Sequence, residues 1–211
     1  MKIIYLKKVD STQKYLKEYL VNNDNISDIC FYSYCQTEGK GSQNNTWEGT
    51  NGNLFFSFVV SLDSLPLDLP LQSCSIYFAY LLKDILSNQG SNIVLKWPND
   101  FYINKNKIGG VITNKYKNYL LCGIGLNIIE TKSFAGCLDI DINKEELLKQ
   151  YFIKLKVYPT WKQIFSKYKL EFHQNKIYFT NINNKKISLE NAFLNDDGSL
   201  NINNKKVYSL R

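Results

Sequence analysis

The run IVLKWPNDFYINKNKIGGVITNKYKNYLLCGIGLNI, residues 93–128, decides the architecture of this chain. Its apolar and β-branched segments predict strands at about 93–97, 100–104, 107–114 and 119–128. Asn-Lys-Asn at 104–106 and Lys-Tyr-Lys-Asn at 115–118 have the composition of hairpin turns. We therefore expect a series of strands joined by hairpins in the middle of the chain.

Outward from this run, apolar residues at helical spacing alternate with further strand-like segments. Helices are expected to begin near Ser11, Pro70, Asn143 and Pro159, with the second ending near residue 88 before Gly90, and strands at 29–35 and 53–62. After about residue 174, short alternating segments are separated by turns such as Asp196-Asp197-Gly198. The sequence thus predicts an α+β fold. Residues 1–174 are expected to form a mixed sheet with helices packed on one face, and residues 175–211 a small β-barrel.

Composition excludes several classes of protein. The chain has 211 residues, of which 44% are hydrophobic, enough for a real core. No apolar run approaches the ~20 residues of a membrane span, and the start does not have the pattern of a secretory signal. The five cysteines form no C-x-x-C pair. We therefore expect a cytoplasmic protein with reduced thiols and no membrane partner.

Charge is unevenly distributed among residue types. Lysine and arginine outnumber aspartate and glutamate by 26 to 19, which gives a net charge of +7, and the only arginine is Arg211. No mechanism that needs a guanidinium fork inside the protein is therefore available. The lone His173 lies near an expected helix end, where a capping or solvated role is the simpler interpretation.

Three segments depart from ordinary core or surface patterns. The first, residues 36–47, is a glycine-rich loop whose backbone N–H groups and Lys40 could approach an anion. The alternative interpretation is a flexible hairpin loop with no ligand. The second joins Lys96-Trp97-Pro98-Asn99-Asp100 to Lys107 and Gly109-Gly110. Two lysines beside a proline corner and a glycine-stripped strand suit a phosphate or carboxylate clamp, whereas the alternative is a simple turn with a bulge. The third is Gly123-Ile-Gly-Leu-Asn127, where glycines within a strand suggest close approach of a ligand or of another backbone.

In this order and spacing, these segments resemble the biotin protein ligase family. The matching residues are Ser11-Thr12, Gln36-Thr37, Gly39-Lys40-Gly41, Trp47, Asn53-Leu54, Lys96-Trp97-Pro98-Asn99-Asp100, Lys107 with Gly110, and Gly123, Gly125 and Asn127. The chain departs from the family pattern at Gln13, where asparagine is usual, and at Lys40 and Ser42, where arginines are usual. Because lysine cannot make a bidentate contact, side-chain recognition by this loop should differ from that of the family.

The resemblance implies a class II synthetase-like catalytic domain followed by an SH3-like barrel. It also implies ATP-dependent activation of biotin as biotinyl-5'-AMP and transfer to a lysine of a biotin carboxyl carrier protein. Lys107 is the implied catalytic residue. The implied biotin-binding residues are Ser11, Thr12, Gln13, Gln36, Gly39, Lys40, Gly41, Ser42, Lys107, Gly110 and Gly125. The implied ATP-binding residues are Lys40, Trp47, Lys96, Asn99, Asp100, Lys107 and Asn127.

The resemblance further implies Mg²⁺ as a companion of ATP, with metal ligands left unassigned, and a monomer or homodimer. Because Ser11 lies so near the start, we expect a monofunctional form without a DNA-binding domain and without a DNA partner.

Two other functions stay open. A lipoate or octanoate ligase or transferase would share the fold, and a basic nucleic-acid-binding module would suit the net charge, although the lysines are scattered and show no known nucleic-acid-binding motif.

Overall fold

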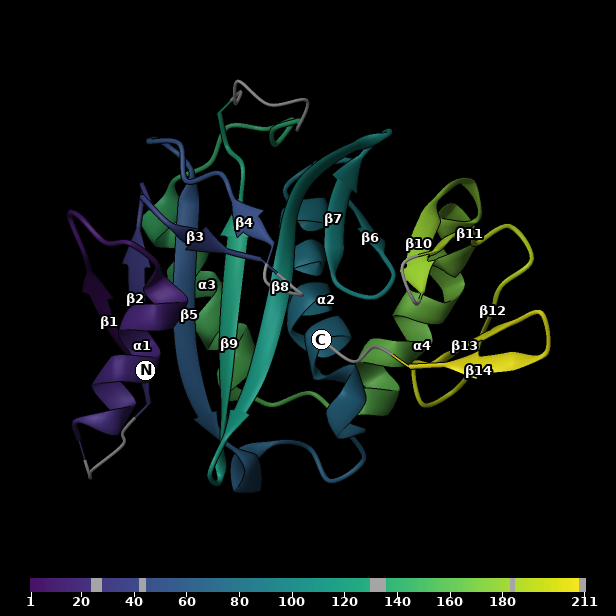
Figure 1. Ribbon diagram of the computed structural model, residues 1–211, viewed down its shortest axis with the longest axis horizontal. Helices are drawn as coiled ribbons and strands as arrows, with labels where there is room; N and C mark the ends of the chain where they lie inside the picture. The colour runs from purple at the N-terminus through teal and green to yellow at the C-terminus, as the bar shows by residue number, and fades with distance from the viewer. Residues whose placement is uncertain (24–27, 42–44, 130–135, 183–184, 209–211) are drawn as a thin grey trace.

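The computed structural model describes residues 1–23, 28–41, 45–129, 136–182 and 185–208. At its centre is a seven-stranded mixed sheet in the order β1-β2-β5-β9-β8-β7-β6 (Figure 1). The strands are β1 (Lys2–Tyr5), β2 (Ile29–Ser33), β5 (Leu54–Ser61), β6 (Val94–Lys96), β7 (Asp100–Ile103), β8 (Asn106–Tyr116) and β9 (Tyr119–Leu126). β1 pairs with β2 in parallel, and every other neighbouring pair in this sheet is antiparallel.

The α-helices are α1 (Thr12–Val21), α2 (Cys74–Asn88), α3 (Lys144–Lys156) and α4 (Trp161–Glu171), with short 3₁₀ turns η2 (Leu62–Ser64), η3 (Leu71–Ser73) and η4 (Phe172–Ile177). Side chains cap three of the helices at their N-termini. Ser11 accepts from the backbone of α1, Asn143 from that of α3, and Thr160 forms a capping box with Gln163 on α4. No helix in the described part of the chain is long and apolar enough to span a membrane.

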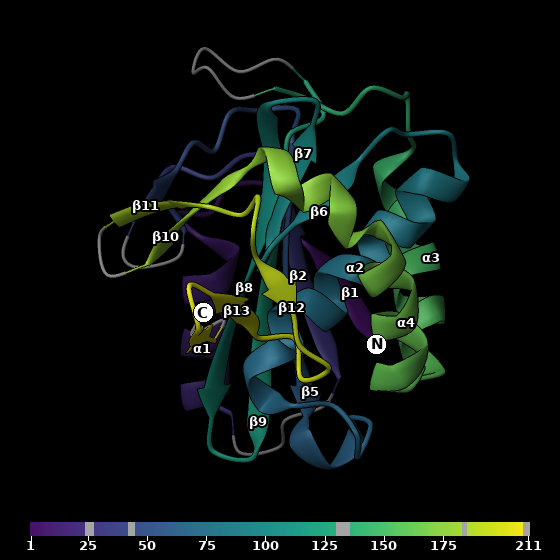
Figure 2. The same cartoon turned by 90° about the vertical axis from the view of Figure 1, so that its right-hand side faces the viewer.

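The two faces of the sheet are covered differently, as the side view in Figure 2 shows. Helices α2, α3 and α4 pack on one face, and their apolar side chains form the main core with those of the sheet. Helix α1 packs on the opposite face, where Leu16 and Leu20 meet Phe31 and Val59. The prediction that helices occupy one face is therefore correct for three helices and wrong for α1. The alternating strand pattern supplies apolar residues to both faces, so it does not assign a helix to one of them.

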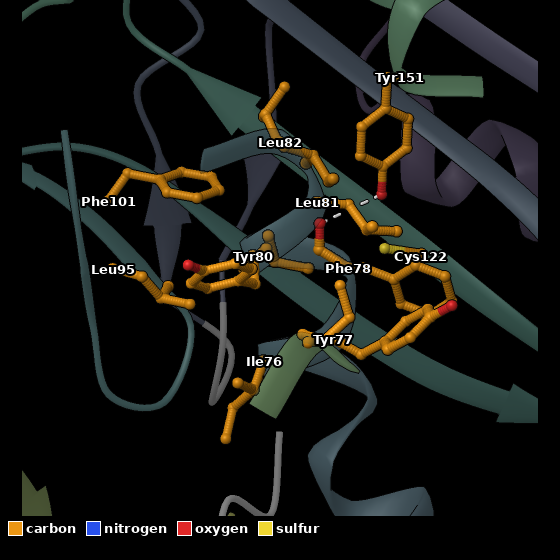
Figure 3. Packing of buried hydrophobic residues seen from close by; sticks show 14 of the residues in the cluster. Ile76, Tyr77, Phe78, Tyr80, Leu81, Leu82, Leu95, Phe101, Cys122 and Tyr151 are labelled. Carbon is orange, nitrogen blue, oxygen red and sulfur yellow. Dashed lines mark hydrogen bonds between the residues drawn. The ribbon is translucent and has the colours of Figure 1, made fainter. Parts of the chain in front are cut away.

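The main core is rich in aromatic rings (Figure 3). Tyr151 of α3 packs edge-on against Phe58 of β5, and its hydroxyl donates to the carbonyl of Phe78 at 3.3 Å. Because buried hydroxyls need a partner, this bond allows a tyrosine in an apolar layer. These ring contacts and the Tyr151 bond join α2 and α3 to each other and to this face of the sheet.

The remaining strands form small sheets outside the main one. A hairpin of β3 (Gly39–Lys40) and β4 (Thr46–Trp47) lies over the face that carries α1 (Figure 1). The C-terminal part folds into β10 (Phe179–Ile182), β11 (Lys185–Ser188), β12 (Phe193–Leu194), β13 (Leu200–Ile202) and β14 (Lys205–Val207). These strands make one two-stranded and one three-stranded antiparallel sheet. The predicted α+β arrangement with a small strand-rich C-terminal part is confirmed.

Several predicted boundaries shift. β8 continues to Tyr116, beyond the expected end at residue 114, and β9 ends at Leu126. The helix expected from Pro70 begins at Cys74 after the turn η3, because Pro70 itself has extended backbone. β1 was not predicted, since a short edge strand has little periodicity to detect. His173 lies exposed in η4 with its Nδ1 atom 2.9 Å from the Leu170 carbonyl, as the simpler interpretation expected.

Candidate active site

A pocket of about 190 Å³ lies on the face of the sheet that carries α1. Its floor is made of strand residues, three of which are glycines. Gly125 of β9 stands opposite Gly110 of β8 and Phe55 of β5, and Gly123 stands opposite Ile112 and Ser57. A β-carbon at Gly125 would lie 3.3 Å from the Trp47 ring, so this glycine allows the β3–β4 hairpin to approach the sheet. The glycines therefore hollow the sheet surface under the hairpin.

One end of the pocket is a network of neutral hydrogen-bonding groups. Gln36 Oε1 accepts from the Thr12 backbone N–H at 2.7 Å and from the Thr12 hydroxyl at 3.1 Å. The Thr12 hydroxyl also lies 2.9 Å from the Ser57 hydroxyl. Because its oxygen is used in this way, the Gln36 side chain is held in one orientation, with its NH₂ group as a donor. This end suits a neutral ligand group that accepts and donates hydrogen bonds.

The other end of the pocket is charged. Lys107 Nζ lies 2.6 Å from Asp100 Oδ1, and Lys96 Nζ lies 3.5 Å from Asp100 Oδ2. Lys107 also stands 5.2 Å from the centre of the Trp47 ring. Asp100 is buried, whereas the Lys107 side chain is 36% exposed. One carboxylate thus sits between two ammonium groups, and with Lys40 on the rim this end favours an anion.

Three buried polar atoms in the pocket wall lack a hydrogen-bond partner among the described residues: Gln13 Oε1, Trp47 Nε1 and Asn99 Oδ1. Asn99 still donates from Nδ2 to the Val111 carbonyl at 2.5 Å. An unpaired buried polar atom is costly in an isolated protein. Because these atoms face a cavity, a molecule bound in the pocket would be able to complete their hydrogen bonds.

The structure brings most of the predicted site residues to this pocket. Those that line it are Ser11, Thr12, Gln13, Gln36, Lys40, Gly41, Trp47, Asn99, Asp100, Lys107, Gly110 and Gly125. The lining does not include Gly39, Lys96 or Asn127. Ser42 lies outside the described residues.

The residues outside the lining support it instead. A β-carbon at Gly39 would lie 2.5 Å from the Trp47 carbonyl, so Gly39 permits the hairpin. Lys96 pairs with Asp100, and its ammonium lies 5.0 Å from the centre of the Tyr102 ring. The Asn127 amide donates to the Gly136 carbonyl at 3.3 Å, beyond the end of β9. Direct ligand contact by these three residues is therefore not visible in the pocket geometry.

Sequence reasoning did not include all of the lining residues. The lining residues that had no assigned binding role are Asn45, Thr46, Phe55, Ser57, Val111, Ile112, Gly123 and Ile124, although Asn45 and Thr46 belong to the first candidate segment and Gly123 and Ile124 to the third. Ser57 could have been found, because it is a polar residue in the otherwise apolar run LFFSFVVS and is fully buried. Phe55, Val111 and Ile112 are ordinary strand residues whose position depends on strand register.

No cysteine or histidine lines the described pocket. Cys30, Cys74 and Cys122 are buried, and burial raises the pKa of each thiol, that of Cys74 to about 12. A thiol with a raised pKa is a poor nucleophile at neutral pH. Among the described residues no group of three His, Cys, Asp or Glu side chains could hold a metal ion. The site's own chemistry thus depends on lysines, one aspartate, neutral polar groups and backbone.

The fold and the site together define an α+β protein with a mixed polar and cationic pocket on a glycine-stripped sheet. A family model described as the Biotin/lipoate A/B protein ligase family matches residues 5–128, which is more than half of the chain. The chain belongs to this family.

Individual proteins similar to this chain are named as enzymes that act with biotin. Over 156 residues the chain is 30% identical to Biotin--protein ligase 2 of Arabidopsis thaliana, and the match covers 64% of the chain and 47% of that protein. The chain thus spans about half the length of this curated relative. A crystal structure of biotin acetyl coenzyme A carboxylase synthetase from Helicobacter pylori with bound biotinylated ATP has 36% identity and a TM-score of 0.93, covering 98% of the chain and 99% of that protein. Biotin protein ligase from Aquifex aeolicus, at 23% identity and a TM-score of 0.78, shares the fold, with 100% and 96% covered.

Proposed function

We propose that this protein is a biotin protein ligase. It uses ATP to activate biotin as biotinyl-5'-AMP and transfers the biotinyl group to a lysine of a biotin carboxyl carrier protein. The single observation that carries the proposal is the close match, at 36% identity and a TM-score of 0.93, to the Helicobacter protein solved with biotinylated ATP. The division of the pocket into a neutral end and a cationic end is consistent with a ligand that has a neutral ring and an anionic group.

The neutral end, formed by Thr12, Gln36 and Ser57, would bind the ureido ring of biotin. An amide-like ring needs both donors and acceptors, and the fixed NH₂ of Gln36 and the two hydroxyls supply them without a full charge. Phe55 in the floor offers apolar surface to the sulfur-containing ring and chain. This end would thus determine which acid is activated.

The cationic end would carry out the activation. The biotin carboxylate attacks the α-phosphorus of ATP, a P–O bond forms, and pyrophosphate leaves with the electron pair of the broken P–O bond. Negative charge builds up on the phosphate oxygens, so a nearby ammonium lowers the barrier. Lys107 would take this role, and its position between Asp100 and the Trp47 ring, with more than a third of its side chain accessible, supports the proposal. In the second step the acceptor amine attacks the mixed anhydride, AMP leaves, and the amine loses a proton.

Magnesium would accompany the nucleotide. Asp100 is the carboxylate among the described lining residues, and both of its oxygens face lysines. Such a set does not fit a resident metal cage, whereas Mg²⁺ commonly binds through substrate phosphates with few protein ligands. Any Mg²⁺ here is therefore expected to be held mainly by the ATP phosphates.

The proposal is tested by incubating the protein with ATP, Mg²⁺ and a biotin carboxyl carrier domain, with either biotin or lipoate. The mass of the acceptor is then measured. We expect a mass increase of one biotinyl group with biotin and none with lipoate, together with biotin-dependent ATP–pyrophosphate exchange. Modification with lipoate instead would replace the proposal with lipoyl chemistry, and absence of both products would refute it.

A further inference from the structure

The C-terminal part of the chain contacts the segment that carries the charged end of the pocket. We call residues 96–100 of this segment, together with Lys107, the charged corner. Trp97 follows Lys96 and comes just before Pro98 and Asn99, but it does not line the pocket. It is only 2% exposed, and its indole Nε1–H donates to the Gly198 carbonyl at 2.8 Å. In Figure 1 the C-terminal strands lie beside the β6 edge of the main sheet. The sequence motif that carries the charged end is thus tied to a turn about a hundred residues later.

The backbone of Trp97 is held from the same side. Its N–H donates to Asn175 Oδ1 at 2.7 Å, and Asn175 Nδ2 donates to the Leu95 carbonyl at 3.1 Å. Asn175 is buried, so its amide takes the place of a neighbouring strand along β6. Both the side chain and the main chain of Trp97 therefore depend on residues after 174.

The turn that accepts the indole bond is itself firmly held. The Ser73 hydroxyl donates to the Asp197 carbonyl at 2.6 Å, and the Trp161 indole donates to the Asp196 carbonyl at 2.8 Å. Gly198 has a φ of +79°, and a β-carbon there would lie 2.5 Å from Ser73 Oγ. A glycine is required at this point because the turn lies against α2 in a left-handed conformation. The Gly198 carbonyl is thus a fixed reference for Trp97.

A short path leads from Trp97 to the pocket. The Asn99 carbonyl accepts from the Val111 N–H at 2.9 Å, and Asp100 pairs with Lys107 at 2.6 Å. Trp97 directly follows the edge strand β6, which pairs with β7 through only three residues, Val94, Leu95 and Lys96. A small displacement of Trp97 would therefore move Asn99 and Asp100, and with them the ammonium of Lys107.

We propose that Trp97 and Gly198 are positioning residues through which the C-terminal part sets the geometry of the charged corner. The proposal rests on the proposed function, because the corner is taken to act in adenylate formation. It assigns a task to the C-terminal strands without any contact between them and the ligand. Misplacement of a reacting group by about 1 Å can cost about a hundredfold in rate. Loss of the hydrogen bond from Trp97 to Gly198 should therefore affect kcat more than the binding of biotin.

The chain offers a matched pair of variants. Trp97→Phe removes the indole donor to Gly198, and Trp161→Phe removes the indole donor to Asp196 in the same turn. Both tryptophans are buried and neither lines the pocket, but Trp161 lies on α4, whereas Trp97 lies in the segment between β6 and β7. In biotin-dependent ATP–pyrophosphate exchange, we expect Trp97→Phe to lower kcat about tenfold or more, with the KM for biotin within about twofold of wild type. Because the Ser73 hydroxyl still holds the turn and the indole bond of Trp97 is intact, Trp161→Phe should leave both constants within about twofold. Equal losses in the two variants, or no loss in either, would overturn the proposal.

A second measurement does not depend on catalysis. The Val111 amide reports the corner directly, because its hydrogen bond goes to Asn99. We expect its hydrogen exchange to be at least about tenfold faster in Trp97→Phe and unchanged in Trp161→Phe. If wild type shows no exchange of pyrophosphate, the proposed function fails, and Val111 protection still decides the positioning. If Trp97→Phe does not fold, the double variant Ser73→Ala/Trp161→Phe, which removes both side-chain hydrogen bonds to the turn, should show the same two effects to a smaller extent, and wild-type behaviour would refute the proposal.

Discussion

At the residue scale, Lys107 combines accessibility with a strong electrostatic bias. Its ammonium is paired with Asp100 and lies near the Trp47 ring, yet 36% of the side chain reaches solvent or the pocket. An ammonium has three donors, so the pair with Asp100 leaves donors for an incoming anion. Asp100 thus holds Lys107 in place without fully neutralising the site, because Lys96 shares the same carboxylate.

Replacing this lysine tests its role directly. We expect Lys107→Ala to lower kcat for biotin-dependent ATP–pyrophosphate exchange by about a hundredfold or more, the usual effect of removing a group that stabilises developing charge. Lys115→Ala is the matched control, since Lys115 is an exposed lysine on the same strand β8. Its activity should equal that of wild type. Near-normal exchange in Lys107→Ala with an unchanged melting temperature would remove Lys107 from the mechanism.

At the element scale, the paired strands β8 and β9 serve both folding and binding through adjacent glycines. A β-carbon at Gly109 would lie 2.6 Å from the Gly125 carbonyl and 2.8 Å from the Phe101 ring. A β-carbon at Gly110 would lie 3.3 Å from Asp100 Oδ1 and 3.7 Å from Lys107 Cε. Since neighbouring strand residues point to opposite faces, the two glycines answer different demands.

Alanine at each position should separate these demands. We expect Gly109→Ala to lower the free energy of unfolding by roughly 1–3 kcal/mol, the usual cost of overpacking against backbone. Gly110→Ala should change stability by less than about 1 kcal/mol and lower adenylate formation instead, because its methyl group enters the charged end. Urea unfolding and pyrophosphate exchange on both variants measure the two effects. The reverse order of stabilities would contradict this assignment of faces.

The contact between Asp139, which precedes α3, and the segment before β6 predicts how stability depends on pH. Asp139 accepts hydrogen bonds from Ser91 and from the Asn92 backbone and side chain. Although burial acts to raise it, these bonds lower the pKa of Asp139 below its ordinary value of 3.8. The unfolded chain therefore binds the proton more readily, so this contribution to stability is present above about pH 4 and is lost as pH falls through the lowered pKa.

Asp139→Asn removes this titration while keeping the size of the side chain. We expect the variant to be less stable than wild type at pH 7, and the difference to shrink as pH falls below 4. Urea unfolding at a series of pH values checks this. A stability difference that is constant from pH 7 to pH 3 would show that the carboxylate charge is not what Asp139 contributes.

Elements also show which parts of the molecule could be predicted from sequence. The motif residues Lys107, Asp100 and Gly125 were found because their chemistry is unusual for a strand. Ser57 and Ile112 were not, because their place in the floor depends on the register of β5 and β8 against β9. The side of the sheet that α1 covers is likewise set by tertiary packing. The contact between Trp97 and Gly198 joins residues about a hundred positions apart, and no local pattern indicates it.

At the scale of the whole molecule, the net charge of +7 is a property of the surface as much as of the site. Lys40 and Lys107 line the pocket, and Lys96 supports it, but most of the 26 basic residues lie elsewhere. Scattered positive charge raises the rate at which a negatively charged partner arrives, and salt weakens this effect by shortening the range of the field. An acidic acceptor protein would therefore associate faster, whereas the rate of the transfer step after docking would not depend on this attraction.

We therefore expect salt to slow the arrival of the acceptor and to leave the transfer step after docking unchanged. Protein already loaded with biotinyl-5'-AMP is mixed with the carrier domain, and the transfer rate at limiting acceptor is followed between about 20 mM and 500 mM salt, where the screening length falls several-fold. We expect the second-order rate constant to fall about tenfold or more, and the rate at saturating acceptor to change by less than about twofold. A carrier domain whose surface carboxylates are replaced by amides is the control and should lose most of the salt dependence. If it keeps the full dependence, the net charge of this chain does not steer its acceptor, and the excess lysine reflects composition alone.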